Sequence, residues 1–302
     1  MATTTGNAAA VLDPDALAPG ASSWVRVAWL APLVSLLLSA LYGPTLVLLG
    51  RQWWDDSNYT HGFLVPLFSG YLVWRQRARL VALAPRGSAL GLPVLLAGIA
   101  ALLLGDVAAE LFLMRASLIV VLAGLVLFHL GCAVFRVVLF PLAFLLFMVP
   151  LPAILFYAIT FPLQSLAAQQ AAWALDLLGV PVILDGNVIH LSQLTLGVTE
   201  ACSGIRSLIS LLGGAVAWAY LALPAGWMMV LFVASTVPIT ILANAGRVIS
   251  TGLIGQWFGV EYASGFFHTF SGWAVFVFAF ICLFAVHGLL RWARGRLARR
   301  RA

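Results

Sequence analysis

Long apolar runs alternate with short polar or arginine-bearing breaks along almost the whole chain. An apolar run of about 20 residues is long enough to cross the hydrocarbon core of a bilayer as a helix. Such runs predict spanning helices over residues 26–49, 61–74, 88–105, 110–131, 137–156, 202–222, 226–247 and 268–290. We therefore expect an all-α polytopic membrane protein with about eight transmembrane helices.

Two segments between the fifth and sixth runs have a different pattern. Residues 157–180 are apolar, but polar side chains interrupt the run at Gln164, Gln169, Gln170 and Asp176. This pattern predicts an amphipathic helix lying along the outer membrane surface rather than a further crossing. In residues 181–198, β-branched and polar residues alternate around Asp185-Gly186-Asn187, which predicts a small external β-hairpin just before Cys202.

The polar ends of the chain differ from the apolar body. Residues 1–24 are small and polar and are expected to form a disordered cytoplasmic leader, without the basic and apolar regions of a signal peptide. Residues 25–291 are expected to form a single multi-pass membrane domain. Residues 292–302 are rich in arginine and are expected to form a basic cytoplasmic tail.

Composition and charge agree with a membrane protein and set its orientation. The chain is 63% hydrophobic and only 9% charged, whereas soluble domains carry about 25% charged residues. All 16 basic residues are arginines. They gather after the second run and at the C-terminus, while tryptophan and aspartate follow the first run, so both termini are expected on the cytoplasmic side of the membrane. These arginines suit anionic lipid, and without interleaved aromatic residues they do not indicate nucleic-acid binding.

Three reactive side chains fall at predicted helix ends. Cys202 begins the sixth predicted span, Arg247 ends the seventh and His268 begins the eighth. Counting crossings places all three at the outer face of the membrane. A cysteine thiolate at a helix N-terminus is a nucleophile, an imidazole can transfer its proton, and a guanidinium can stabilise an oxyanion. The sequence therefore predicts a cysteine acyl-transfer site.

Four further polar residues are candidates for substrate binding or for supporting this site: Glu200, Arg206, Asn244 and His61. Other interpretations stay open at this point. Arg247 is also compatible with a structural ion pair to Glu200 or Glu261, because an intramembrane arginine needs a partner. A serine nucleophile at Ser203 or Ser207 lacks a carboxylate–histidine pair at useful spacing. No metal-ligand spacing or phosphate-binding glycine loop is present, so neither a metal nor a cofactor is expected.

The segment Thr-Glu-Ala-Cys-Ser-Gly-Ile-Arg-Ser-Leu at 199–208 resembles an exosortase of the exosortase/archaeosortase family. The resemblance extends to Asn-Ala-Gly-Arg-Val at 244–248 after Pro238, and to His268 at the head of the last run. It also covers Tyr-Thr-His-Gly at 59–62, Trp-Arg-Gln-Arg at 74–77 and Gly-Asn-Val-Ile at 186–189.

This resemblance implies a bacterial inner-membrane cysteine protease or transpeptidase with Cys202, Arg247 and His268 as its catalytic residues. Its substrates would be membrane-tethered exported proteins with a C-terminal sorting signal of the PEP-CTERM type, which comprises a Pro-Glu-Pro-like motif, a transmembrane helix and a basic tail. Cleavage would proceed through a thioester at the outer face. The family is also linked to exopolysaccharide and biofilm systems, so exopolysaccharide-assembly proteins are implied partners.

Three other functions are compatible with the residues alone. A transporter or lipid-flipping protein would use Arg247 and Glu200 as intramembrane charges, although no inverted repeat of the kind many transporters contain is visible. A non-enzymatic subunit of polysaccharide export would not need Cys202. A simple protease differs from a transpeptidase only in whether water or an amine resolves the thioester. Replacing Cys202 by alanine separates the enzyme from the first two alternatives.

Overall fold

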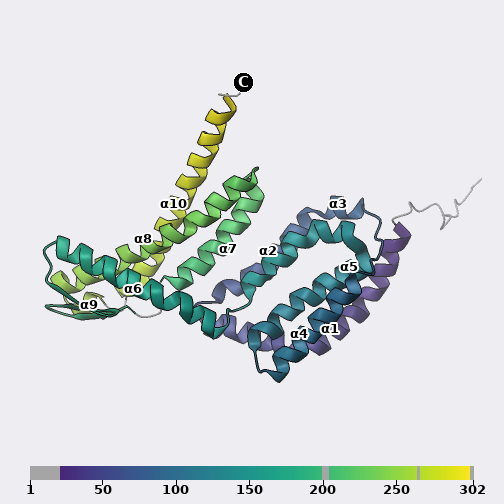
Figure 1. The fold of residues 1–302 in the computed structure, drawn as a ribbon, viewed down its shortest axis with the longest axis horizontal. Coiled ribbons are helices and arrows are strands. Elements are labelled where there is room, and N and C mark those ends of the chain that lie inside the picture. The colour runs from purple at the N-terminus through teal and green to yellow at the C-terminus, as the bar shows by residue number, and fades with distance from the viewer. Residues whose placement is uncertain (1–20, 199–203, 264–265, 300–302) are drawn as a thin grey trace, which may run out of the picture. The chain divides into compact units, whose positions relative to one another are not determined.

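The computed structural model describes residues 21–198, 204–263 and 266–299. It is helical apart from one small sheet (Figure 1). Within the described residues, five helices are long and apolar enough to cross a membrane, and a sixth, α4 (Gly91–Val107), is apolar but shorter. The predicted all-α membrane class is therefore confirmed. The chain divides into two compact units, one of residues 1–52 and 62–149, and one of residues 53–61 and 150–302.

The first unit contains most of α1 (Ala21–Asp55), then α2 (Leu64–Arg75), α3 (Arg77–Val81), α4, α5 (Leu111–Phe144) and the short 3-10 helix η3 (Leu145–Met148). A 3-10 turn, η2 (Thr60–Phe63), leads into α2. Helices α4 and α5 pack closely through glycines: a Cβ on Gly98 would lie 2.7 Å from Val121 Cγ2, and one on Gly124 would lie 2.6 Å from Leu95 N. Small residues at such contacts let membrane helices approach each other.

The count of five long helices is lower than the expected eight because two predicted spans merge into α5 and two others correspond to the shorter helices α2 and α4. Helix α5 runs through both the fourth and fifth predicted spans, with a break at Gly131, where φ is 83° and ψ is 178°. A side chain there would collide with the carbonyl oxygen of Arg86, so only glycine fits. The second predicted span is shared between η2 and the 12-residue α2. The fifth predicted span was drawn too long, because Pro150 and Pro152 separate η3 from the next helix.

The second unit begins with α6 (Ala153–Leu177) and continues with strands β1 (Val182–Asp185), β2 (Val188–Leu191) and β3 (Thr195–Gly197). The sheet is antiparallel in the order β1-β2-β3. The predicted hairpin is present: Asp185 pairs with Val188 across a two-residue turn, and Gly186 has a φ of 60°. The third strand was not predicted. It adds to β2 through the pairs Ile189–Leu196 and His190–Thr195.

The segment predicted as a surface helix is helical, but its polar residues do not form one water-facing stripe. Gln164 is buried and accepts a hydrogen bond from Asn187 Nδ2 at 3.4 Å, whereas Gln169 and Asp176 are exposed. Large apolar side chains, including Phe161 and Trp173, also lie on the exposed side. The buried face of α6 packs its small side chains on the sheet and on α8, in a cluster that contains Ala168, Ala171, Leu175, Ile189 and Val248.

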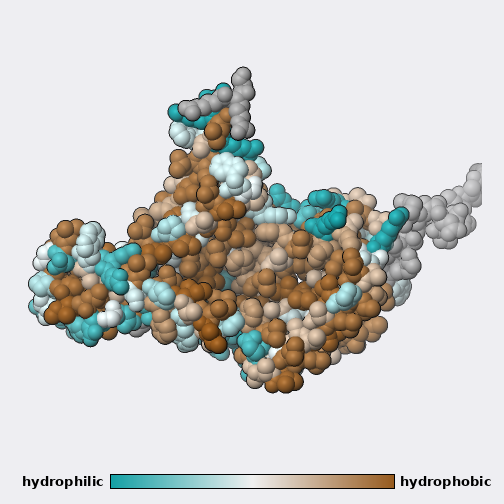
Figure 2. Space-filling model, in the orientation of Figure 1, coloured by the Kyte–Doolittle hydropathy of each residue, from teal (hydrophilic) through white to brown (hydrophobic). Residues whose placement is uncertain are grey.

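Three long helices complete the second unit: α7 (Ile205–Ala222), α8 (Gly226–Phe258) and α10 (Phe266–Arg299), with the four-residue α9 (Val260–Ala263) before the last. Their shared core includes Leu211, Ala219, Met228, Phe232 and Leu283. Outside this core, apolar side chains cover the exposed faces of the helices, while hydrophilic residues gather at the C-terminal end of α10 (Figure 2). Exposed apolar faces of this kind are typical of helices that face lipid.

Candidate functional site

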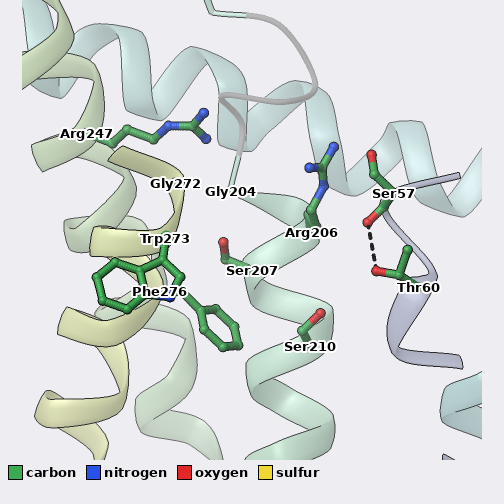
Figure 3. A pocket seen from close by; sticks show the side chains of 10 residues that line it. All are labelled: Ser57, Thr60, Gly204, Arg206, Ser207, Ser210, Arg247, Gly272, Trp273 and Phe276. Carbon is green, nitrogen blue, oxygen red and sulfur yellow. Dashed lines mark hydrogen bonds between the residues drawn. The ribbon is translucent and has the colours of Figure 1, made fainter. Parts of the chain in front are cut away.

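A pocket of about 400 Å³ opens within the second unit, between the start of α7, the middle of α8 and the first part of α10 (Figure 3). The loop after α1 and the first residue of η2 supply the remaining wall. The lining residues are Ser57, Thr60, Gly204, Arg206, Ser207, Ser210, Arg247, Gly272, Trp273 and Phe276. All ten belong to the second unit.

Arg247 reaches this pocket from α8 and lies against α10. A Cβ on Gly272 would be 3.8 Å from Arg247 Cζ and Nη2, so the glycine leaves room for the guanidinium to lie on the helix surface. Gly272 follows His268 by one helical turn, and residues four apart share a helix face. The backbone of α10 therefore places His268 on the face that Arg247 contacts.

The prediction that Arg247 ends its helix is wrong, because α8 continues to Phe258. A helix of 33 residues is about 50 Å long, which exceeds the roughly 30 Å hydrocarbon core. The residues after Arg247 pack on α6 and the sheet, with Val248 buried and Ile249 and Leu253 beside it. This packing extends the helix past the apolar run from which its end was predicted.

An asparagine of α8 packs against the start of α7. Gly204 precedes the helix with a φ of 78°, in the left-handed region that favours glycine. The position of its missing Cβ lies 3.1 Å from both Cβ and Cγ of Asn244, and Asn244 is buried. Asn244 thus packs directly beneath the turn that follows Cys202 in sequence, one helical turn before Arg247 on α8.

Arg206 lies in the first turn of α7 and lines the pocket. Its Nε donates a hydrogen bond to Asn58 Oδ1 at 3.3 Å. His61 comes from the same loop segment, and its Nδ1 lies 3.4 Å from Ser210 Oγ, itself a pocket residue. The loop between α1 and α2 therefore contacts α7 through two separate polar pairs.

The structure thus brings together the segments that carry the predicted site, although not every side chain is described. Arg206 and Arg247 line one pocket, Asn244 lies beneath its floor, and His61 contacts its wall. Cys202 and Glu200 lie outside the described residues, and α7 begins at Ile205. For His268 the backbone is described and the side chain is not. The catalytic assignment of Cys202, Arg247 and His268 stays a prediction.

Sequence reasoning missed the aromatic wall and the loop residues of the pocket. Phe276 follows His268 and Gly272 at four-residue intervals, so helical spacing on α10 was a signal for it. Trp273 is adjacent to Gly272. Ser57 and Thr60 had no comparable signal, because the long-range contact between their loop and α7 leaves no periodic pattern.

The side chains that line the pocket suit an uncharged or acidic group. Two guanidinium groups and four hydroxyl side chains line it, and no described lining residue is acidic. Preorganised cationic donors can stabilise a developing oxyanion. Among the described residues, no three His, Cys, Asp or Glu side chains gather as a metal site would require.

Comparison with known families gives a match over most of the chain. The family described as Transmembrane exosortase (Exosortase_EpsH) matches residues 53–285, which include the pocket, α6, the sheet and all of α7 and α8. Searches of curated proteins and of solved structures gave no match. Because the family match covers well over half of the sequence, the chain belongs to the transmembrane exosortase family.

Proposed function

We propose that this protein is a membrane-embedded cysteine protease or transpeptidase that cleaves C-terminal sorting signals of the PEP-CTERM type from exported proteins. Membership of the exosortase family implies a transmembrane enzyme of this general class. The observation that carries the proposal is the packing around one pocket: Arg247 of α8 lies against Gly272 of α10, one turn after His268, and Asn244 packs against Gly204, which follows Cys202 closely in sequence.

In the proposed mechanism, His268 takes the proton of the Cys202 thiol, and the thiolate attacks the scissile carbonyl carbon. Arg247 stabilises the negative charge that develops on the carbonyl oxygen. The tetrahedral intermediate collapses, the C–N bond breaks, and the imidazolium of His268 gives its proton to the leaving amine. The acyl group stays on Cys202 as a thioester. An incoming amine or water then attacks the thioester and releases the thiol.

The proposed topology has about eight crossings, with both termini in the cytoplasm and the pocket at the outer face of the inner membrane. The break at Gly131 supports this count, because it divides α5 into two legs that could cross separately. With α6 on the outer surface, the sheet and the start of α7 lie on one side. A substrate tethered by its own helix then presents its scissile bond near the pocket, and tethering raises its effective concentration.

Substrate processing in cells tests this function. A tagged exported protein with a PEP-CTERM-type signal is co-expressed with wild type, Cys202→Ala, Arg247→Ala or His268→Ala, and its cleavage is followed by electrophoresis. We expect cleavage by wild type and none by Cys202→Ala at equal expression, with strong losses in the other two variants. Equal processing by wild type and Cys202→Ala would remove the thioester mechanism and favour a transporter or an assembly subunit.

A further inference from the structure

Arg206 has no part in the mechanism above, yet it lines the same pocket as Arg247. The two arginines come from different helices and have different surroundings. Arg247 extends from α8 and packs against Gly272 of α10, while Arg206 is exposed and hydrogen-bonded to Asn58 in the loop after α1. In Figure 3 both guanidinium groups lie toward one end of the pocket, and the rings of Trp273 and Phe276 lie toward the other. The pocket therefore has a cationic end and an aromatic end.

The hydrogen bond to Asn58 fixes how Arg206 presents its guanidinium. It uses Nε, which lies on one side of the planar group. Only Nε of Arg206 has a hydrogen-bond partner among the described residues, and the two terminal nitrogens form the pair of donors that matches the two oxygens of a carboxylate. Since Asn58 and Arg206 lie 148 positions apart in the chain, this is a tertiary contact that orients the side chain.

The other walls limit what the ligand can be. Trp273 is 64% exposed, so its ring is available for contact with an apolar or ring-shaped group. Ser207 and Ser210 offer hydroxyls along α7 between the two ends. A peptide segment in which an acidic side chain adjoins an apolar residue satisfies both ends of the pocket at once. A lipid phosphate would meet only the cationic end.

We propose that Arg206, held by Asn58, binds an acidic side chain of the substrate peptide and thereby selects the substrate, whereas Arg247 serves the reacting carbonyl. This inference rests on the proposed function, because it takes the ligand to be the peptide substrate of the same pocket. It assigns Arg206 to specificity and Asn58 to the positioning of Arg206.

The test uses the full chain, purified and reconstituted in lipid nanodiscs, and a fluorogenic peptide that contains the Pro-Glu-Pro-type motif. A second peptide has glutamine in place of the glutamate. Wild type, Arg206→Gln, Asn58→Ala and the control Arg291→Gln, at the far end of α10, are compared by the ratio of kcat/KM for the two peptides. We expect wild type and the control to prefer glutamate by roughly 10-fold, a modest value because Arg206 is exposed.

In Arg206→Gln the ratio should fall to near one, through a rise in KM for the glutamate peptide. Asn58→Ala should give an intermediate ratio, because the guanidinium remains but loses its orientation. Arg206→Glu should reverse the preference toward a peptide with lysine at this position. A reversal of this kind cannot come from misfolding alone, which would slow all peptides together.

Two results would overturn the inference: an unchanged ratio in Arg206→Gln, whether or not both rates fall together, or a dependence of the rate on anionic lipid that disappears with Arg206. The last result would assign Arg206 to a lipid phosphate. Peptide binding to Cys202→Ala, measured by fluorescence anisotropy, separates this inference from the proposed function. Binding that depends on both the glutamate and Arg206 supports the subsite even if wild type cleaves nothing.

Discussion

Gly204 shows how a single residue shapes the start of α7. Its φ of 78° is unfavourable for any residue with a Cβ, and that Cβ would lie 3.1 Å from the buried Asn244. We expect Gly204→Ala to cost about 1–2 kcal/mol of stability through the left-handed backbone alone. It should also reduce substrate cleavage, because Gly204 lies two residues after the proposed nucleophile in sequence and its backbone must shift.

The matched control for this substitution lies on the same helix. Gly214 is in the interior of α7, and no atom lies within 4 Å of its added Cβ. Alanine is more stable than glycine in a helix interior, so Gly214→Ala should unfold at the wild-type temperature or slightly above it. Thermal unfolding in detergent and cleavage of the tagged substrate measure both variants. Equal melting temperatures and activities in the two variants would contradict the role given to Gly204.

Asn187 connects the sheet to the segment that leads toward Cys202. Its Nδ2 donates to the carbonyl oxygen of Val198 at 3.1 Å, and its own carbonyl accepts from Val198 N at 2.9 Å. Asn187→Asp keeps the shape but replaces the donor by an acceptor facing that carbonyl. We expect a loss of about 1–3 kcal/mol and faster hydrogen exchange in residues 195–198. Gln169→Ala, at an exposed position of α6, is the control, and its hydrogen exchange in residues 195–198 should match that of wild type.

At the scale of elements, the contact between α4 and α5 depends on glycines at positions where the backbones meet. An added Cβ at Gly124 would lie 2.6 Å from Leu95 N and 2.7 Å from Leu95 Cα, which are backbone atoms that cannot rotate away. We expect Gly124→Ala to push the helices apart and to cost about 1–3 kcal/mol.

The unfolding midpoint in detergent is the measurement for Gly124→Ala, and Gly70→Ala on α2 is its control. No atom lies within 4 Å of the Cβ position at Gly70, so this variant should melt at or above the wild-type temperature. Equal unfolding midpoints for Gly124→Ala and Gly70→Ala would contradict the prediction that stability depends on the close approach of α4 and α5.

Apolar run length was enough to predict the helices but not all of their ends. The long helices were located because each contains a run that can fill a bilayer, and the start of α8 at Gly226 matched its Pro-Ala-Gly break. The end of α8 was missed because Val248 and its neighbours pack on a sheet that run length does not reveal. Strand β3 has only three residues, too few for a periodic signal. For the pocket, Arg206, Arg247 and Asn244 were identified from chemistry, while Trp273 and Ser57 depend on tertiary contacts.

At the scale of the whole molecule, whether α6 crosses the membrane determines the side on which the sheet lies. If α6 stays on the outer surface, the sheet lies outside and the C-terminus inside, in agreement with the C-terminal arginines. If α6 crosses, the sheet lies in the cytoplasm and the C-terminus lies outside, together with its arginine run. The two topologies therefore predict opposite sides of the membrane for the sheet and for the C-terminus.

Labelling of single cysteines distinguishes the two topologies. Cys132, Cys202 and Cys282 are replaced by alanine, and one cysteine is introduced at Asp185 in the sheet or at Gly295 near the end of α10. A membrane-impermeant maleimide should label Asp185→Cys in intact spheroplasts, and Gly295→Cys only after lysis. Arg79→Cys, in the arginine-rich segment after α2, provides the cytoplasmic reference. Arg79 precedes α6 in the chain, so its side of the membrane does not depend on whether α6 crosses.

Labelling of Gly295→Cys without lysis, together with protection of Asp185→Cys, would show that α6 crosses and that the pocket faces the cytoplasm. In that topology an exported substrate could not reach the pocket from outside, so this outcome would also contradict the proposed function.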